Sequence, residues 1–216
     1  MKIRVLGCHG SQLPKYNTTS FLLGQNVLLD AGTVTTVLSL REQLKIDYVF
    51  ITHAHLDHVR DLTFLADNIF FHRRKRPLVI VGTKGILDST HRHLFNNVIW
   101  PDFSKMPSVK APLVKFQVIV PGRKQTIGDL QIRAIDLNHV VETVGYVIVS
   151  KGKAVIFLGD TGPTKEVWQV AQKTKGLHAV FIETSLPDSM KDVADITGHL
   201  TPFSLQAELK KLKGKK

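Results

Sequence analysis

Short apolar segments separated by turn residues dominate the first part of the chain. Residues 2–6, 19–23, 26–30 and 47–52 are rich in aliphatic, β-branched and aromatic side chains. Gly, Asn or Asp residues stand at or near their ends, which is typical of strands in a folded sheet. The segment 47–52 is β-branched and aromatic, so we expect a buried strand there.

The same pattern continues through the rest of the chain. Alternation and β-branched content predict five further strands. They comprise residues 77–82, 113–120, 130–136, 144–150 and 154–160. Between them, residues 97–112 contain three prolines and no clear period, which indicates a functional or mobile irregular segment.

Three segments have the spacing and the end signals of helices. Residues 33–44 predict one helix, and a second is expected to start near Pro163 and end near Gly176. Thr201 and Pro202 are a candidate N-cap and first helical residue of a third. Strands followed by strands mixed with helices favour an α/β domain of layered sheets and helices, spanning the whole chain.

The charge of the chain permits an anionic substrate but does not demand one. The 29 Lys and Arg residues outnumber the 18 Asp and Glu residues, which gives a formal net charge of +11. Part of this excess is local, because residues 72–77 and 210–216 contribute four and five positive charges. A basic tail is more often a solvated end than a binding device, so charge alone does not select a partner.

Cysteine content and hydropathy limit the classes of protein that the chain can represent. A single cysteine, Cys8, excludes an intramolecular disulfide framework and fits a reducing cytoplasm. The N-terminal residues lack the apolar region of a signal peptide. No apolar run approaches the length needed to cross a bilayer, so we expect a cytoplasmic protein without a membrane partner.

The segment "THAHLDH", residues 52–58, concentrates possible metal ligands directly after the predicted strand 47–52. His53 and His55 are two residues apart, which on extended backbone places both rings on one side. Asp57 and His58 project differently and suit a second ion beside the first. A histidine-rich loop without metal is the alternative, but this density of imidazole and carboxylate ligands has little packing rationale.

Three later residues could complete such a site because each stands at a strand end or just before a helix. His139 follows the strand 130–136, Asp160 ends the strand 154–160, and His199 precedes the third helix. Each could serve alone as a cap or turn residue. Together with the first cluster they provide five histidines and two aspartates, enough for two ions that share a carboxylate.

This ligand pattern resembles the metallo-β-lactamase superfamily of dinuclear hydrolases over nearly the whole chain. The resemblance implies a single domain, residues 1–216, with a four-layer αβ/βα sandwich in which two mixed sheets are flanked by helices. It also implies that His53, His55 and His139 hold one ion, that Asp57, His58 and His199 hold the other, and that Asp160 bridges them. Ligands of this kind suit Zn²⁺ first, with Mn²⁺ or Fe²⁺ as alternatives.

Finer motifs resemble the class II 3′,5′-cyclic-nucleotide phosphodiesterases of that superfamily. They are "HLFNNVIWPDFS" (93–104), "FIETSLPD" (181–188) and "ADITGHLTP" (194–202), together with the opening segment 6–33. The chain departs from the superfamily at Arg60 and Asp61, where a glycine is common. The resemblance implies hydrolysis of cAMP or cGMP to the 5′-monophosphate.

Several residues are candidates for roles in this reaction. Two ions would activate a bridging water, and the resulting hydroxide would attack phosphorus in line with the 3′ oxygen. Asp57 could orient this nucleophile or accept its proton, and His93 is the best candidate among the other histidines for proton transfer.

Trp100 and Phe103 could stack on the base, or could anchor their segment to the core. Glu183 and Thr184 end a strand, where they could orient a metal-bound histidine or act as caps.

Two other functions remain open. The tRNA 3′-processing endonucleases, ribonuclease Z-like members of the same superfamily, share this ligand set, and a basic surface would suit tRNA. They usually carry a long flexible arm, which is not visible in this sequence. A metal-independent nucleic-acid-binding module would leave the seven ligands unexplained. Nucleic acid is therefore a partner only under these alternatives, and the resemblance also leaves a homodimer open.

Overall fold

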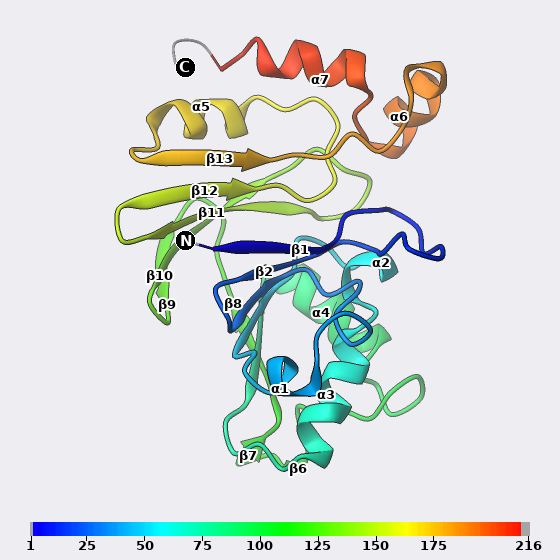
Figure 1. The fold of residues 1–216 in the computed structure, drawn as a ribbon, viewed down its shortest axis with the longest axis vertical. Helices are drawn as coiled ribbons and strands as arrows, with labels where there is room; N and C mark the ends of the chain where they lie inside the picture. Colours follow the sequence, from blue (N-terminus) through cyan, green and yellow to red (C-terminus); the bar gives the residue numbers. More distant parts are fainter. Residues whose placement is uncertain (1, 213–216) are drawn as a thin grey trace. The chain divides into compact units, whose positions relative to one another are not determined.

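The computed structural model describes residues 2–212, so that residues 213–216 of the basic tail lie outside the described part. The chain divides into two compact units, a first unit Met1–Val118 and a second unit Ile119–Lys216. Each unit has one main β-sheet with helices beside it (Figure 1). Every helix in the described part is too short or too polar to cross a membrane. The assignment of residues 1–216 to a single domain stays a prediction.

The first unit is built on a six-stranded mixed sheet with the order β1-β2-β3-β4-β5-β8. The β1–β2 and β2–β3 pairs are antiparallel, whereas β3–β4, β4–β5 and β5–β8 are parallel. The strands are β1 (Ile3–Gly7), β2 (Ser20–Leu23), β3 (Val27–Leu29), β4 (Tyr48–Phe50), β5 (Leu78–Gly82) and β8 (Val114–Val118). Because β3 and β4 run in parallel, their carboxyl ends meet at one edge of the sheet, and the segment with the clustered histidines begins there.

Helices and a small hairpin complete the first unit. The helices are α1 (Leu40–Gln43), α2 (Leu56–Val59), α3 (Leu62–Phe71) and α4 (Lys84–His93). The α3 helix is anchored by buried side chains that include Leu62, Leu65 and Ile69. The N-cap of α4 is Thr83, whose hydroxyl accepts a hydrogen bond from the backbone N–H of Ile86. Strands β6 (Pro107–Ser108) and β7 (Ala111–Pro112) pair within the irregular segment 97–112.

The helix predicted for residues 33–44 is wrong over most of its length. Only α1 is helical, and the preceding residues form turns. The Asp61 carboxylate accepts hydrogen bonds from the backbone N–H groups of Val34 and Thr35, at 2.7 and 2.8 Å. These bonds hold the backbone in a turn, and four β-branched residues between positions 33 and 36 disfavour a helix there.

The second unit contains a five-stranded mixed sheet with the order β13-β12-β11-β10-β9. Strands β12 and β13 are parallel, and the other neighbours are antiparallel. The strands are β9 (Lys124–Ile127), β10 (Leu130–Asp136), β11 (Val144–Ser150), β12 (Lys153–Phe157) and β13 (Leu177–Phe181). Strand β9 was not predicted, because it is a mostly polar strand at the sheet edge and lacks a continuous apolar signal.

The α5 helix (Glu166–Lys173) provides four of the eight buried residues in one core cluster of the second unit. Its Trp168 is buried and packs in a cluster with Ile135, Val147 and Ile156 of the sheet. The indole N–H of Trp168 donates to the carboxylate of Glu208, which is also buried. Glu208 lies on α7 (Pro202–Leu209), whose N-cap is Thr201, as predicted. The remaining elements are a short 3-10 turn (Asp188–Met190) and α6 (Lys191–Thr197).

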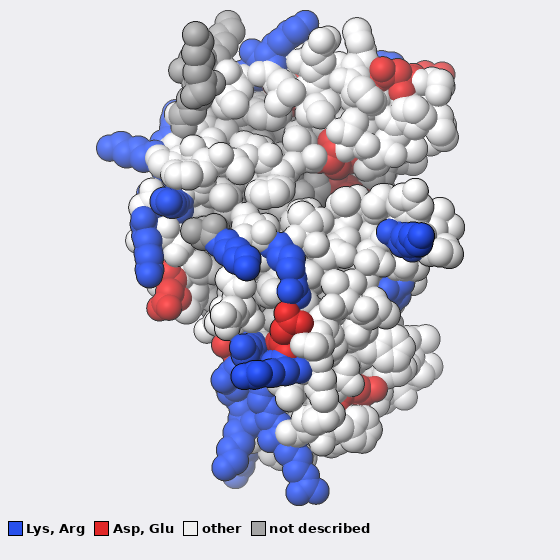
Figure 2. All heavy atoms as spheres, viewed as in Figure 1, with Lys and Arg blue, Asp and Glu red and all other residues white. Residues whose placement is uncertain are grey.

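Basic side chains are unevenly distributed on the surface. Figure 2 shows Lys and Arg outnumbering Asp and Glu on the visible face. The loop between α3 and β5 carries four consecutive basic residues, 73–76, of which Arg74 is partly buried and donates to the backbone carbonyl of Ile46. Burial and the neighbouring Arg76 lower the pKa of Arg74 to about 10, although Asp47 opposes this shift. Part of this charge therefore stabilises the loop.

Candidate metal centre

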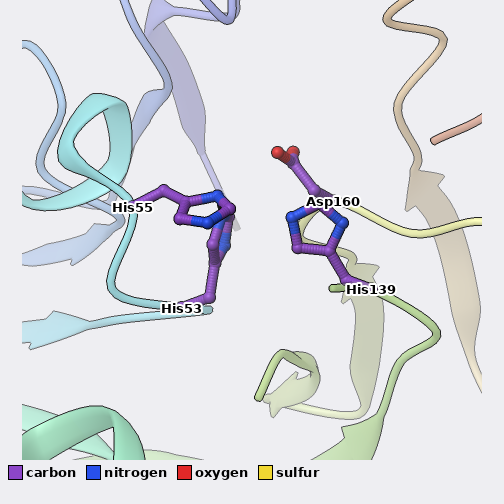
Figure 3. A group of neighbouring side chains, drawn as sticks. All are labelled: His53, His55, His139 and Asp160. Carbon is purple, nitrogen blue, oxygen red and sulfur yellow. Dashed lines mark hydrogen bonds between the residues drawn. The ribbon is translucent and has the colours of Figure 1, made fainter. Parts of the chain in front are cut away.

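The turn after β4 brings two imidazole rings together in the first unit. His53 is fully buried and His55 is half-buried. The Nε2 atom of His53 lies 3.0 Å from the Nδ1 atom of His55, and the two rings meet edge to face (Figure 3). At this distance one nitrogen can donate a hydrogen bond to the other. Alternatively, the lone pairs of both nitrogens can bind one cation. This is the geometry that the two-residue spacing predicts.

Asp57 and His58 lie on the first turn of α2, immediately after His55. The Nε2 atom of His58 is 3.4 Å from Oδ2 of Asp57. On the other side of the ring, Nδ1 of His58 lies 2.8 Å from Oδ2 of Asp30. When the Asp30 carboxylate is ionised it only accepts hydrogen bonds, and Nδ1 of His58 then carries the proton, which makes Nε2 the candidate metal-binding nitrogen.

Asp30 is a candidate site residue that the sequence interpretation missed. It follows β3, is fully buried and has a positive φ of 56°. Its two carboxylate oxygens also accept hydrogen bonds of 2.8 Å from the backbone N–H and the hydroxyl of Thr52. Burial raises the pKa of Asp30, while His58 and Thr52 act in the opposite direction. The one available signal was an acidic residue at the end of an otherwise apolar strand, in "NVLLDAG".

The second unit contributes His139, Asp160 and His199. His139 follows β10, and its Nδ1 lies 3.0 Å from the backbone carbonyl oxygen of Gly198. The rings of His139 and His199 are 5.0 Å apart, centroid to centroid. Asp160 lies three residues beyond β12, and Figure 3 shows it with His139. The structure therefore gathers these three residues of the second unit, as their positions near strand ends predict.

Glu183 orients His199. Asp160, Glu183 and His199 each offer a ligand atom within 4.8 Å of the others. However, Oε1 of Glu183 accepts hydrogen bonds from Nδ1 of His199 and from the backbone N–H of Thr161, both at 2.8 Å. Oε2 accepts one from the backbone N–H of Ser185 at 3.0 Å. Glu183 is thus occupied by donors, and His199 Nε2 and Asp160 are left as the candidate ligands.

The donor set fits divalent metal ions. Neutral imidazole nitrogens and carboxylate oxygens are the ligands of zinc and related cations. His58 and His199 each present one nitrogen to a carboxylate, at Asp30 and Glu183, and His139 presents one to a carbonyl. Such contacts fix the tautomer and orientation of metal-binding histidines. Each unit on its own therefore carries histidines arranged as metal ligands.

The residues proposed for substrate contact have different environments. Phe103 is 2% exposed and packs near Phe70 and Phe95, which favours the alternative role of anchoring its segment. Trp100 is half-buried, with its ring edge-to-face with Phe64 at 5.2 Å. His93 is exposed on the last turn of α4.

Arg60 and Asp61, where the sequence departs from the superfamily, form a local network. Arg60 donates to Asp61 at 3.1 Å, to Thr33 at 3.3 Å and to Gln12 at 3.4 Å. Asp61 is buried and also holds the turn at residues 34–35. Arg60 and Asp61 therefore connect Gln12 of the N-terminal loop with the turn that precedes α1.

Comparison with known proteins identifies relatives over most of the chain. Residues 25–216 match the family described as the beta-lactamase superfamily domain. A probable 3′,5′-cyclic-nucleotide phosphodiesterase of Yersinia pestis is 29% identical over 77% of this chain and 51% of its own length. A ribonuclease Z of Treponema pallidum is 32% identical over 67% of this chain and 46% of its own length. The chain thus spans about half the length of these curated relatives.

The fold is shared with a solved phosphodiesterase structure. Unliganded yeast PDE1 matches with a TM-score of 0.83 and 20% sequence identity, over 97% of this chain and 82% of that protein. At this identity the likeness concerns the fold alone. Together with the family match and the two mixed sheets with their helices, it confirms the predicted α/β fold class.

Proposed function

The chain belongs to the metallo-β-lactamase superfamily, as its motifs predict, and we propose that it hydrolyses 3′,5′-cyclic nucleotides to 5′-monophosphates. The observation that carries the proposal is the pair of ring nitrogens of His53 and His55, 3.0 Å apart, in a chain with relatives named as cyclic-nucleotide phosphodiesterases. Superfamily membership implies divalent metal ions, and the histidines of each unit suit them.

The proposed ligand assignment uses seven residues. His53, His55 and His139 would hold one ion and Asp57, His58 and His199 the other, and Asp160 would be shared by both. Support comes from the superfamily pattern and from the contacts of three members of the set. Nδ1 of His58, His139 and His199 is occupied by Asp30, Gly198 and Glu183 respectively, which makes Nε2 the candidate ligand atom of each ring.

The protein residues would bind and orient the substrate and move protons. Two bound ions would supply Lewis acidity and an activated water. Asp57 is partly exposed, and its Oδ2 can orient the attacking water or accept its proton. The 3′ oxygen leaves with a proton, for which His93 is the proposed donor. Trp100 and Phe103 stay as proposed base contacts, although the burial of Phe103 favours its anchoring role.

The test is turnover by metal-loaded protein. We expect release of AMP or GMP from the cyclic nucleotide, with Zn²⁺ loading compared against Mn²⁺ and Fe²⁺. Asp160→Ala should lower kcat/KM by more than about a hundredfold, because loss of one supporting contact at a metal site already costs about ten- to a hundredfold. Asp136→Ala, at an exposed aspartate of the same unit, is the matched control. Normal turnover by the Asp160→Ala protein would refute the bridging assignment.

Ribonuclease Z-like cleavage of precursor tRNA is the second candidate. The 32% identity to the Treponema pallidum relative and the net charge of +11 favour it. The same preparation should be incubated with precursor tRNA. Clean 3′ cleavage without hydrolysis of either cyclic nucleotide would replace the first proposal by this one.

A further inference from the structure

A cavity of about 210 Å³ lies in the second unit beside His139. Its lining includes Asn138, Val140, Pro163, Asp195 and Ile196. Complete small-molecule sites typically measure about 300–1,000 Å³, so this cavity suits one part of a ligand rather than a whole nucleotide.

Two walls of the cavity are apolar side chains that face solvent. Val140 is 58% exposed and Ile196 is 77% exposed. Both residues line the cavity together with the candidate ligand His139, and Val140 also follows His139 in the chain. Apolar side chains left in water next to a concave site are typical of ligand-binding surfaces, because a ligand ring would remove them from water.

The floor of the cavity is backbone at close range. A Cβ atom on Gly198 would lie 3.0 Å from Cα of His139, and one on Gly162 would lie 3.2 Å from Nδ2 of Asn138. Gly198 also ends α6 with a positive φ of 68°, which favours glycine. Glycine at these two positions therefore allows the backbone segments that line the cavity to approach one another closely.

Charge determines which part of a nucleotide fits. Asp195 is one of the lining residues, and its carboxylate forms an ion pair with Lys191 one turn earlier on α6. A carboxylate repels phosphate but accepts hydrogen bonds from the N–H groups of a base. The phosphate would therefore be disfavoured in the cavity, whereas an uncharged planar ring would be tolerated.

We propose that this cavity binds the nucleobase of the substrate, with Ile196 and Val140 against the faces of the ring. The proposal rests on the proposed function, because it assigns one end of the cyclic nucleotide to the cavity. It adds Ile196 and Val140 to the proposed base contacts Trp100 and Phe103. Ile196 is then a residue that determines affinity and takes no part in the chemistry.

The test compares Ile196→Ser with Val193→Ser, a matched control on the same helix that is 42% exposed and does not line the cavity. Substrates are cAMP, cGMP and methyl ribofuranoside 3′,5′-cyclic phosphate, which lacks a base. Ile196→Ser should raise KM for the two nucleotides about tenfold, equivalent to about 1.4 kcal/mol. Their kcat and all constants for the baseless compound should stay unchanged. An equal rise for the baseless compound, or no rise at all, would overturn the proposal.

Equilibrium binding separates this inference from the proposed function. Calorimetric titration should show AMP and GMP binding the wild-type protein more tightly than ribose 5-phosphate. Ile196→Ser should abolish that advantage and Val193→Ser should retain it. If the wild-type protein hydrolyses no cyclic nucleotide, the proposed function fails, while the titration still decides whether the cavity binds a base. Equal affinity of the wild-type protein for AMP and ribose 5-phosphate would refute the cavity assignment.

Discussion

Two carboxylates that hold histidines, the buried Asp30 and the partly buried Glu183, are the main finding at the scale of single residues. Asp30 in the first unit and Glu183 in the second each accept a hydrogen bond from one histidine and from a nearby backbone N–H group. Each carboxylate therefore holds one imidazole ring in place, and a backbone N–H group holds the carboxylate in place. This arrangement orients an imidazole before any metal binds.

Replacement of Asp30 by Asn should weaken metal binding. Asn keeps the size of the side chain but loses the charge that holds the proton on Nδ1 of His58, so His58 can adopt the wrong tautomer. We expect about a ten- to hundredfold loss of metal affinity, measured by titrating metal-free protein with Zn²⁺ and a competing chelator. Asp88→Asn, at an exposed aspartate of α4, is the control. Unchanged affinity in the Asp30→Asn protein would show that Asp30 does not orient a ligand.

The residues of the candidate site differ in how far the sequence could predict them. His53, His55, Asp57 and His58 were predicted because ligand density and spacing are local properties. Asp30 was missed because its partner is 28 positions away, and a single acidic residue after a strand is also a common turn residue. Long-range pairing of this kind requires the parallel register of β3 and β4, which the sequence alone does not specify.

At the scale of elements, Asp102 organises the irregular segment after α4. Its carboxylate is buried and accepts from His91 at 3.2 Å and from Lys105 at 2.8 Å. It also accepts from the backbone N–H of Ser104 at 3.1 Å. Its own backbone N–H donates to the side chain of Asn97 at 2.9 Å. Asp102 thus connects α4 with residues 97, 104 and 105, and contacts of this kind leave no periodic signal in the sequence.

These contacts make the stability of the first unit dependent on acidity. Burial alone would raise the pKa of Asp102, but hydrogen bonds from Lys105, Ser104 and His91 outweigh it and hold the pKa at about 2. A pKa below the ordinary value of 3.8 stabilises the fold above that value, and this stabilisation is lost as the pH falls towards 2. The shift corresponds to about 2 kcal/mol at neutral pH.

Asp102→Asn should therefore lower the free energy of unfolding by about 2 kcal/mol at pH 7. The difference from the wild-type protein should fall to about half at pH 3, where the unfolded chain already binds the proton. Urea unfolding of metal-free protein at both pH values measures this, with Asp88→Asn as the control. A difference that stays constant between the two pH values would assign the loss to packing.

The strands were predicted more successfully than the helices for a physical reason. Strands such as β4, β5 and β11 are apolar along their whole length, so their signal is contained within each segment. The helix expected at 33–44 depended on the spacing of its residues and on its local end signals. It was overridden by Asp61, a residue from another part of the chain that binds the N–H groups of Val34 and Thr35.

At the scale of the whole molecule, the proposed ligands come from both compact units, so metal should contribute to the stability of the complete chain. A ligand that binds only the folded state stabilises it by about 4 kcal/mol at a thousandfold excess over Kd. For a chain of this size, such a change corresponds to a rise in Tm of about 8–16 °C. Calorimetry of metal-loaded and chelator-treated protein should show this difference. Asp160→Asn should reduce it, and Asp136→Asn should preserve it. If the loaded protein retains its metal but both preparations unfold at one temperature, the ions would be bound too weakly, or at too exposed a place, to be the proposed centre.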